Sequence, residues 1–231
     1  MCRPGIAKGQ HPVNLNVTSS DELFDVLDRA GRQTGETKPR KFVHRDGDWH
    51  RAFHCWVIVS TGEPEPSVII QRRGLMKDTW PDRLDVSVGG HFAAGEVLAD
   101  VIREMDEEIG QVAPITELRL LGTRISIGGH RAGVLDNEFQ DVYLWQTALP
   151  FDAFRPNPDE VAWIELITIR ELVELITGTD GEAKTHVRLP DGSDRRGKII
   201  ANDFIPSPDQ YVRRAAIAMD LAIRGYPHPV I

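Results

Sequence analysis

The chain has 231 residues, 41% of them hydrophobic, which suits one sizeable domain with extensions or at most two small ones. Its formal net charge of −8 argues against a protein that coats nucleic acid, and no apolar run is long enough to cross a bilayer. Cys2 and Cys55 give no disulfide framework, and residues 1–20 lack the apolar region of a secretory signal. We therefore expect a cytoplasmic protein that binds neither a nucleic acid polymer nor a membrane.

The first third of the chain predicts an arm and a set of strands. Residues 1–20 are polar and predict a loose N-terminal arm, and residues 22–27 predict a strand that runs into a turn. The charged stretch 32–49 predicts a loop or a short irregular strand. Residues 51–60 are rich in aromatic and β-branched side chains and predict a central strand, to which residues 67–73 pair back.

Residues 89–110 predict a glycine-led loop followed by a helix that ends at Gly110. At about 100° per residue, one arc of this helix carries acids and the adjoining arc is apolar. The acids are Asp100, Glu104, Glu107 and Glu108, and the apolar residues are Val101, Ile102, Met105 and Ile109. A solvated acidic face is one interpretation. The other is a site where the three glutamates bind Mg²⁺, with Arg103 clamping the loop at Glu96.

The remaining chain predicts further strands and two helices. Residues 118–127 predict a strand that ends at Gly128-Gly129, and residues 138–147 predict another. Residues 161–167 predict a short strand leading into a helix capped by Thr168 and Glu171 and ending at Gly178.

The C-terminal part predicts a loop region and a final helix. Residues 179–206 predict mostly loop, with a hairpin near residues 190–192. The final helix is expected to begin with Ser207 as N-cap, Pro208 as the first helical residue and Gln210 closing a capping box, and to end at Gly225. Its apolar stripe predicts packing on the domain, or an interface in a homodimer.

The 89–110 segment resembles the Nudix box, whose signature is G-x5-E-x7-R-E-U-x-E-E-x-G-U, with U an aliphatic residue. Gly90 and Glu96 match the first spacing, and the stretch from Arg103 to Gly110 matches the second half. Only six residues separate Glu96 from Arg103, where the family has seven, and Gln111 occupies the last aliphatic position. The deletion lies at the helix entrance, so it affects the contact of Glu96 with Arg103 more than the glutamates.

A second group of residues surrounds the box. The runs KFVHRDGDWHRAFHCW, QRRGLMKDTWP, GGH and DNEFQDVYL are similar to the isopentenyl-diphosphate-isomerase-like branch of Nudix proteins. A single histidine is more often structural than a ligand, but the resemblance implies a second metal site. Its residues would be His44, His50, His91, Asp136 and Glu138, with His54 nearby. Gly89 stands where the isomerases carry a catalytic cysteine, so the chain is closer to the hydrolase-like members of the branch.

These resemblances imply an α/β fold: a Nudix α/β/α sandwich with a mixed sheet, plus a C-terminal helical extension. The expected division is an arm (1–20), a Nudix domain (21–178) and a C-terminal loop and helix packed on it (179–231). The basic cluster of Arg72, Arg73 and Lys77 is either solvated charge or a clamp on the substrate's phosphates.

The activity that the resemblance implies is Mg²⁺-dependent hydrolysis of a diphosphate linkage in a small molecule, with Mn²⁺ as an alternative ion. Glu104, Glu107 and Glu108 would hold the metal, Arg103 would support them, and the general base would be Glu107, Glu108 or Glu138. Two other functions stay open. One is an isopentenyl-diphosphate isomerase, and the other is a non-catalytic module that binds a nucleotide as a sensor.

Overall fold

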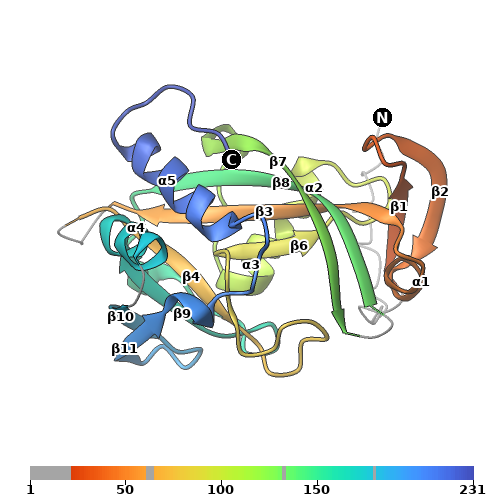
Figure 1. The fold of residues 1–231 in the computed structure, drawn as a ribbon. Coiled ribbons are helices and arrows are strands. Elements are labelled where there is room, and N and C mark those ends of the chain that lie inside the picture. Colours follow the sequence, from red (N-terminus) through yellow and green to blue (C-terminus); the bar gives the residue numbers. More distant parts are fainter. Residues whose placement is uncertain (1–21, 61–64, 132–133, 179–180) are drawn as a thin grey trace, which may run out of the picture.

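One mixed sheet of eleven strands organises the molecule (Figure 1). The computed structural model describes residues 22–60, 65–131, 134–178 and 181–231, so the expected 1–20 arm lies outside the described residues. The strands are β1 (Leu23–Leu27), β2 (Gln33–Pro39), β3 (Trp49–Val59), β4 (Ser67–Arg73), β5 (Leu84–Asp85), β6 (Val88–His91), β7 (Leu118–Arg131), β8 (Val134–Thr147), β9 (Val161–Thr168), β10 (Glu182–Arg188) and β11 (Asp194–Ile200).

Five α-helices and three short 3₁₀ turns lie between or after these strands in the described chain. The helices are α1 (Arg40–Asp46), α2 (Leu98–Val101), α3 (Arg103–Ile109), α4 (Ile169–Thr177) and α5 (Tyr211–Ile223). The turns are η1 (Ile115–Glu117), η2 (Phe151–Ala153) and η3 (Ala201–Asp203). None of the described helices combines the length and the apolar character needed to span a bilayer.

The strand β3 is the centre of the sheet, as its aromatic and β-branched residues predict. It pairs in parallel with β8 along its whole length, from Trp49 opposite Asn137 to Val59 opposite Thr147. On its other edge it pairs antiparallel with β6 and β4, as the expected return of the 67–73 strand requires. The mixed sheet is therefore confirmed.

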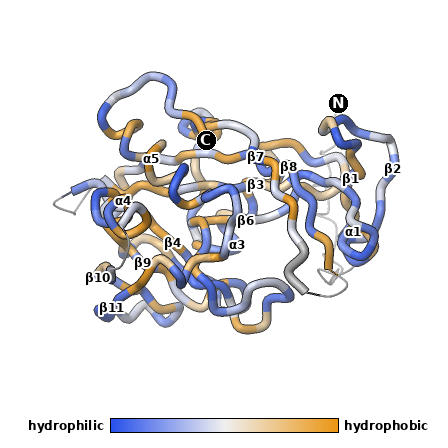
Figure 2. The backbone as a smooth tube through the Cα atoms, viewed as in Figure 1, coloured by the Kyte–Doolittle hydropathy of each residue, from blue (hydrophilic) through white to orange (hydrophobic). Residues whose placement is uncertain are grey.

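Alternating side chains of the central strands form two cores, one on each face of the sheet. In β3, Trp56 and Ile58 belong to one core, whereas Phe53 and Val57 belong to the other. Because successive side chains of a strand point to opposite faces, a strand buried on both faces is apolar throughout. Figure 2 shows this apolar character along β3 and β4.

Helices cover both faces. The helices α4 and α5 pack on the core that contains Trp56, with Leu172 and Ala215 fully buried. The helix α3 packs on the opposite core through Met105 and Ile109, which are also fully buried. The α/β/α sandwich with a C-terminal helix is thus confirmed (Figure 1).

The 32–49 stretch, expected to be a loop or a short irregular strand, contains the strand β2 and also the helix α1, which was not expected. Five consecutive residues of β2 are exposed, which is typical of an edge strand and hides the alternation that predicts strands. The helix α1 has only two turns, buries Val43 and ends at Gly47, whose φ of 70° is left-handed. A single buried apolar residue gives too weak a periodicity for prediction.

The prediction of a single helix after Gly95 is partly wrong, because the helix breaks at Ile102 into α2 and α3. The break lies inside the shortened interval between Glu96 and Arg103. The end of α3 is confirmed, since Gly110 has a left-handed φ of 67°.

The strand expected to end at Gly128-Gly129 continues to Arg131. Both glycines stay paired with the partner strand, Gly128 opposite Asp136 and Gly129 opposite Leu135. Cross-strand pairing outweighs the weak strand preference of glycine here. The strand β8 likewise begins at Val134, four residues before its expected start.

In the C-terminal third, the helix α4 and its cap are confirmed, because the Glu171 amide donates to the Thr168 hydroxyl at 3.1 Å. The 190–192 hairpin is confirmed as β10–β11, but "mostly loop" was wrong for residues 181–206, since β10 pairs with β9 and extends the sheet. The division of the chain at residue 178 stays a prediction.

The final helix begins at Tyr211, four residues after the expected N-cap. Gln210 has a left-handed φ of 55°, so residues 207–210 form a separate turn and no capping box. Ser207 still accepts the Tyr211 amide at 2.9 Å. The expected end is confirmed, because α5 stops at Ile223 and Gly225 is left-handed with φ 81°.

Candidate active site

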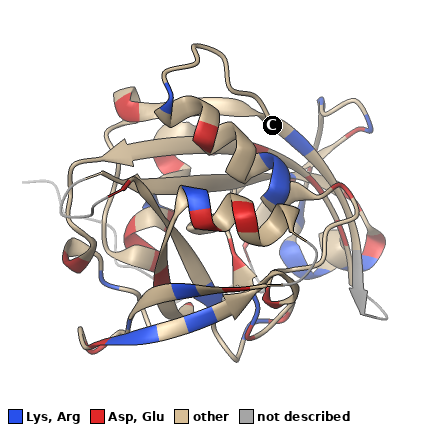
Figure 3. Cartoon of the chain, turned by 60° about the vertical axis from the view of Figure 1, so that its left-hand side comes forward, with Lys and Arg blue, Asp and Glu red and all other residues tan. Residues whose placement is uncertain are grey.

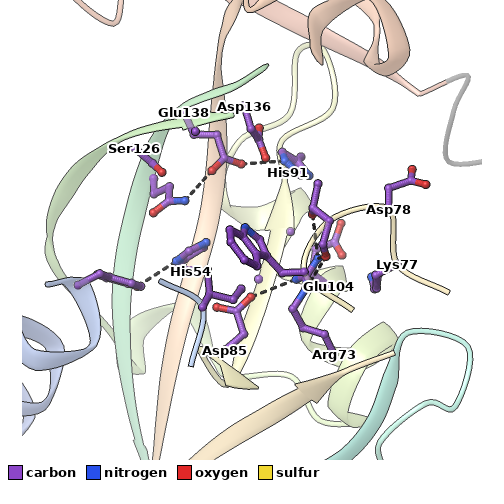
Figure 4. A pocket seen from close by; sticks show the side chains of 18 of the residues that line it. His54, Arg73, Lys77, Asp78, Asp85, His91, Glu104, Ser126, Asp136 and Glu138 are labelled. Atoms are coloured by element: carbon purple, nitrogen blue, oxygen red, sulfur yellow. Dashed lines mark hydrogen bonds and ion pairs between the residues drawn. The ribbon is translucent and has the colours of Figure 1, made fainter. Parts of the chain in front are cut away.

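A pocket of about 1220 Å³ opens over the middle of the sheet. Its walls come from β6, the Nudix-box segment, β7–β8, the loop after β4, and the segment 205–212, which leads into the first turn of α5. Figure 4 shows acidic, basic and histidine side chains from these elements pointing into it. Figure 3 shows Lys and Arg interspersed with Asp and Glu along the chain.

The start of the box brings a backbone turn against the carboxylate of Glu104. A Cβ atom added at Gly90 would lie 2.3 Å from Cδ of Glu104, closer than real atoms approach. Glycine at this position therefore makes room for the glutamate, which is partly buried and lines the pocket. Burial raises the pKa of Glu104 above its usual value, although neighbouring Arg103 opposes this.

Arg103 holds the box together. It reaches Glu96 at 3.1 Å, Glu22 at 3.2 Å and Glu107 at 3.4 Å, and it also contacts Glu104. The clamp between Arg103 and Glu96 therefore forms across six intervening residues. Glu96 also accepts the Ala93 amide at 2.8 Å, which fixes the loop before α2.

Glu108 lies beneath the pocket rather than in its wall. It is 2% exposed and accepts hydrogen bonds from the Gly89 amide at 2.9 Å and from Gln71 at 3.0 Å. Burial raises the pKa of Glu108 to about 8. Glu107 is the opposite case, since its side chain is 53% exposed at the pocket rim.

A histidine-rich group forms the other wall. Among the described residues it is the only group of three or more ligand atoms that lie within 4.8 Å of one another. The glutamates of α3 are not gathered as closely. The members of the group are His44, His50, His91 and Asp136. Glu138 joins them, because its Oε1 lies 2.9 Å from His91 Nε2 and 3.8 Å from His50 Nε2. All five residues that the resemblance implied for a second metal site are therefore together.

The electrostatics of this group suit a cation. The Nε2 atoms of His44 and His50 are buried and have no hydrogen-bond partner in the described part of the chain. Burial lowers the pKa of His44 to about 4 and also lowers that of His50, so both imidazoles are neutral near pH 7. Neutral imidazoles with free nitrogens, next to carboxylates, are the donors that a divalent metal takes.

Glu138 is a charged member of the group. Burial works to raise its pKa, but the hydrogen bond from His91 and the other nearby histidines hold that pKa well below its usual value. Gln140 donates to its second oxygen at 2.6 Å. Glu138 is therefore an oriented carboxylate at the pocket wall.

The expected phosphate clamp is only partly in the pocket. Arg73 and Lys77 line it, but Arg73 is paired with Asp85 at 3.0 Å and Lys77 contacts Glu160. Arg72 does not line the pocket. It bonds to Glu165 at 3.4 Å and stacks on Trp163, which favours a structural role.

Several pocket residues carry no expectation from sequence. They are Arg40, Arg124, Asp209 and Tyr211, together with His54, whose role stayed open. His54 stands four residues after His50 on β3, so both point to the same face of the strand. That spacing could have indicated from the sequence that His54 lies on the same side of the sheet as His50. The place of Arg124, Asp209 and Tyr211 in the pocket depends on how α5 packs on the sheet. No local sequence pattern predicts that packing.

Comparison with known proteins agrees with this geometry. Residues 48–189 match the NUDIX domain family. This range covers more than half of the chain and contains the box glutamates, His50, His91, Asp136 and Glu138, whereas His44, Arg40 and the 205–212 segment lie outside it. The chain belongs to the Nudix family.

Similar proteins indicate to which branch of the Nudix family the chain belongs. It is 33% identical over 197 residues to an uncharacterized Nudix hydrolase of Clostridium acetobutylicum, covering 84% of this chain and 94% of that protein. It is 35% identical over 165 residues to Nudix hydrolase 3 of Arabidopsis thaliana, covering 70% of this chain but only 21% of that protein. It is 32% identical over 160 residues to an isopentenyl-diphosphate Delta-isomerase of Clavibacter sepedonicus, covering 68% and 80%.

The chain is therefore a Nudix enzyme of the isopentenyl-diphosphate-isomerase-like branch. Its general class is a pyrophosphohydrolase, an enzyme that cleaves a diphosphate linkage. Gly89 in β6 lies opposite His54 in β3, at the floor of the pocket.

Proposed function

We propose that this Nudix protein is a Mg²⁺-dependent pyrophosphohydrolase whose substrate is a nucleoside or isoprenoid diphosphate-type small molecule. One observation carries the proposal. A single pocket faces both the box carboxylates, represented by Glu104 and Glu107, and the oriented carboxylate of Glu138 with His91. A diphosphate, with its two adjacent anionic groups, suits a pocket with two sets of metal-ligand side chains.

The side chains that would hold Mg²⁺, or Mn²⁺, are Glu104, Glu107 and Glu108. When bound, such a cation neutralises phosphate charge and lowers the pKa of a water ligand. The histidine-rich group would hold a second ion. We assign the general base to Glu138 or Glu107, because both line the pocket, whereas Glu108 lies beneath it.

The basic residues Arg73 and Lys77 would orient the substrate. Each is paired with a carboxylate, Asp85 and Glu160 respectively. A phosphate oxygen that approaches the pocket can replace or share these partners, since arginine and lysine bind both kinds of anion. Arg103 would act through Glu104 and Glu107, as a positioning residue. A cytoplasmic location and a homodimer stay predictions.

The second candidate is an isopentenyl-diphosphate isomerase. The name of the Clavibacter relative and the histidine-rich group favour it. Gly89 argues against it, because it offers no acid where the isomerases carry a cysteine. A sensor that binds a nucleotide without cleaving it is the third candidate.

The deciding experiment is product analysis with nucleotide, isoprenoid and thiamine-type diphosphates, each with and without Mg²⁺. Wild type would be compared with Glu107→Gln, and with Glu174→Gln as a control, since Glu174 lies on the outer surface of α4. Release of phosphate or pyrophosphate that needs Mg²⁺ and drops about 100-fold or more in Glu107→Gln is the expected result. Conversion of isopentenyl diphosphate to its isomer without phosphate release would favour the isomerase. Ligand binding without any turnover would favour the sensor function.

A further inference from the structure

His54 is the one histidine of the pocket that the proposed metal groups do not use. It belongs to β3, is partly exposed, and lines the pocket beside Gly89. A Cβ atom at Gly89 would lie 3.7 Å from both Cδ2 and Nε2 of the ring. The Nε2 edge of His54 therefore fills the space next to the residue whose amide holds Glu108. In Figure 4 the ring lies between Glu138 and Asp85.

The opposite edge of the ring is held from the C-terminal helix. His54 Nδ1 lies 2.9 Å from the hydroxyl of Tyr211, the first residue of α5. The same hydroxyl accepts the indole N–H of Trp56 at 3.1 Å. Tyr211 is 4% exposed and Trp56 is fully buried, so this junction lies at the buried edge of the His54 ring.

The donors and acceptors at this junction can be counted. The Trp56 indole can only donate, and the Tyr211 hydroxyl has one proton to give. If His54 Nδ1 carried a proton, it would compete with Trp56 as a donor, and the Tyr211 proton would have no acceptor among the described residues. If Nδ1 is bare, Tyr211 donates to it and all three groups are satisfied. Because buried polar groups are nearly always paired, the second arrangement is favoured.

A neutral imidazole with a bare Nδ1 carries its proton on Nε2. In the described part of the chain, no hydrogen bond reaches Nε2 of His54, and the side chain lines the pocket. Burial lowers the pKa of His54 to about 4, which agrees with a neutral ring at neutral pH. The result is a donor that keeps one orientation without carrying charge.

We propose that His54 binds the substrate by donating its Nε2–H to a phosphate oxygen, and that Tyr211 is the positioning residue that fixes this tautomer. The inference rests on the proposed hydrolase function, because it takes the diphosphate as the ligand. An oxygen acceptor is required, since a neutral N–H donor cannot bind a cation. His54 lies between Glu138 and the Glu108 side of the box, and a diphosphate held through cations by both carboxylate groups would pass this position.

The first test reads the tautomer directly. Long-range ¹H–¹⁵N correlation spectra of the full chain report which imidazole nitrogen carries the proton. We expect the Nε2–H form of His54 in wild type at pH 7, and a shift toward a mixture or the Nδ1–H form in Tyr211→Phe, which lacks only the hydroxyl. Tyr226→Phe is the matched control, since Tyr226 is 56% exposed, and should leave the spectrum unchanged. An Nδ1–H tautomer in wild type would overturn the assignment.

The second test measures the binding of inorganic pyrophosphate with Mg²⁺ by calorimetry. His54→Leu should bind it about tenfold more weakly than wild type, as expected for one lost hydrogen bond. Tyr211→Phe should weaken it less, and Tyr226→Phe not at all. Equal affinity of wild type and His54→Leu would overturn this inference while leaving the hydrolase function intact. Absence of binding in wild type would count against the hydrolase function itself, and with it against His54 as a phosphate ligand.

Discussion

At the scale of single residues, the site depends on positions where one particular side chain makes the local contacts. Gly90 is such a position, because its missing Cβ leaves the space that Glu104 occupies. His54 is another, since its two nitrogens meet a buried hydroxyl on one side and the pocket on the other. Neither property is visible in composition or periodicity.

Gly90→Ala should therefore damage the site more than the fold. The new methyl group would push the Glu104 carboxylate away, and a displacement of about 1 Å in an active site can cost on the order of 100-fold in rate. Gly181→Ala is the matched control, because a Cβ there meets nothing within 4 Å. Metal-dependent phosphate release and the midpoint of thermal unfolding would be measured for both. Full activity of Gly90→Ala would contradict the account of this contact.

His54 also predicts how stability changes with pH. Burial lowers its pKa in the folded state to about 4, whereas the unfolded chain has an ordinary value of about 6.5. Below pH 6.5 the unfolded chain binds more protons, so stability falls as the pH drops from about 6.5 to about 4. His54→Gln should reduce this slope by one proton, or about 1.4 kcal/mol per pH unit.

Urea unfolding followed by tryptophan fluorescence between pH 4.5 and 7 measures that slope. His44 and His50 have pKa values lowered in the same direction, so wild type should lose stability more steeply than one proton requires. An unchanged slope in His54→Gln would show that the ring is not buried and neutral.

At the scale of elements, the helix α3 separates stability from chemistry on two faces. Met105 is fully buried in the core, whereas Glu104 lines the pocket and its carboxylate is partly desolvated. Met105→Ala should cost about 2–5 kcal/mol of unfolding free energy through the cavity that it leaves. Glu104→Gln should leave stability nearly unchanged and lower turnover strongly. Denaturant unfolding and steady-state kinetics on both variants test this, and the reverse pattern would refute it.

The segment before α5 should act as a support for the pocket. Arg124 makes a bidentate pair with Asp209 at 2.8 and 2.9 Å and bonds to Gln140 at 2.5 Å, and Gln140 donates to Glu138. Asp209→Asn should therefore destabilise by about 1–3 kcal/mol, because the nearly buried Arg124 loses its charged partner. Turnover should fall with it as Glu138 loses its orientation.

The control for this variant lies near the C-terminal end of α5. Asp220 pairs with Arg224 at 3.0 Å on the surface, where ion pairs contribute little. Asp220→Asn should cost about 0.5 kcal/mol or less in urea unfolding and leave kcat/KM unchanged. Equal losses in the two variants would remove the argument that the Asp209 contact supports the site.

These elements also show what local patterns predict. β3 and β8 were predictable, because strands buried on both faces are rich in β-branched and aromatic residues. α4 was predictable from its cap. The start of α5 was not, because Gln210 adopts a left-handed conformation and residues 207–210 form their own turn beside Arg124. The strand β11 was expected only as part of a hairpin, since its exposed polar residues carry no alternation.

At the scale of the whole molecule, the sheet brings together residues that are far apart in the chain. His44 and His50 come from α1 and β3, His91 from β6, and Asp136 from β8. The resemblance to a known branch predicted this group, whereas spacing alone could not, because contacts across a sheet depend on strand order. The same limit explains Arg72, which the sequence places beside Arg73 but the sheet directs toward Glu165.

The central claim is that two sets of side chains in one pocket serve metal-dependent cleavage of a diphosphate. The most direct measurement is kcat/KM as a function of Mg²⁺ concentration for wild type, Glu104→Gln and the surface control Glu182→Gln, which is 55% exposed. The account predicts turnover that requires Mg²⁺, a loss on the order of 100-fold in Glu104→Gln, and a shift of its Mg²⁺ dependence to higher concentration. Turnover that is independent of Mg²⁺, or equal in all three proteins, would contradict it.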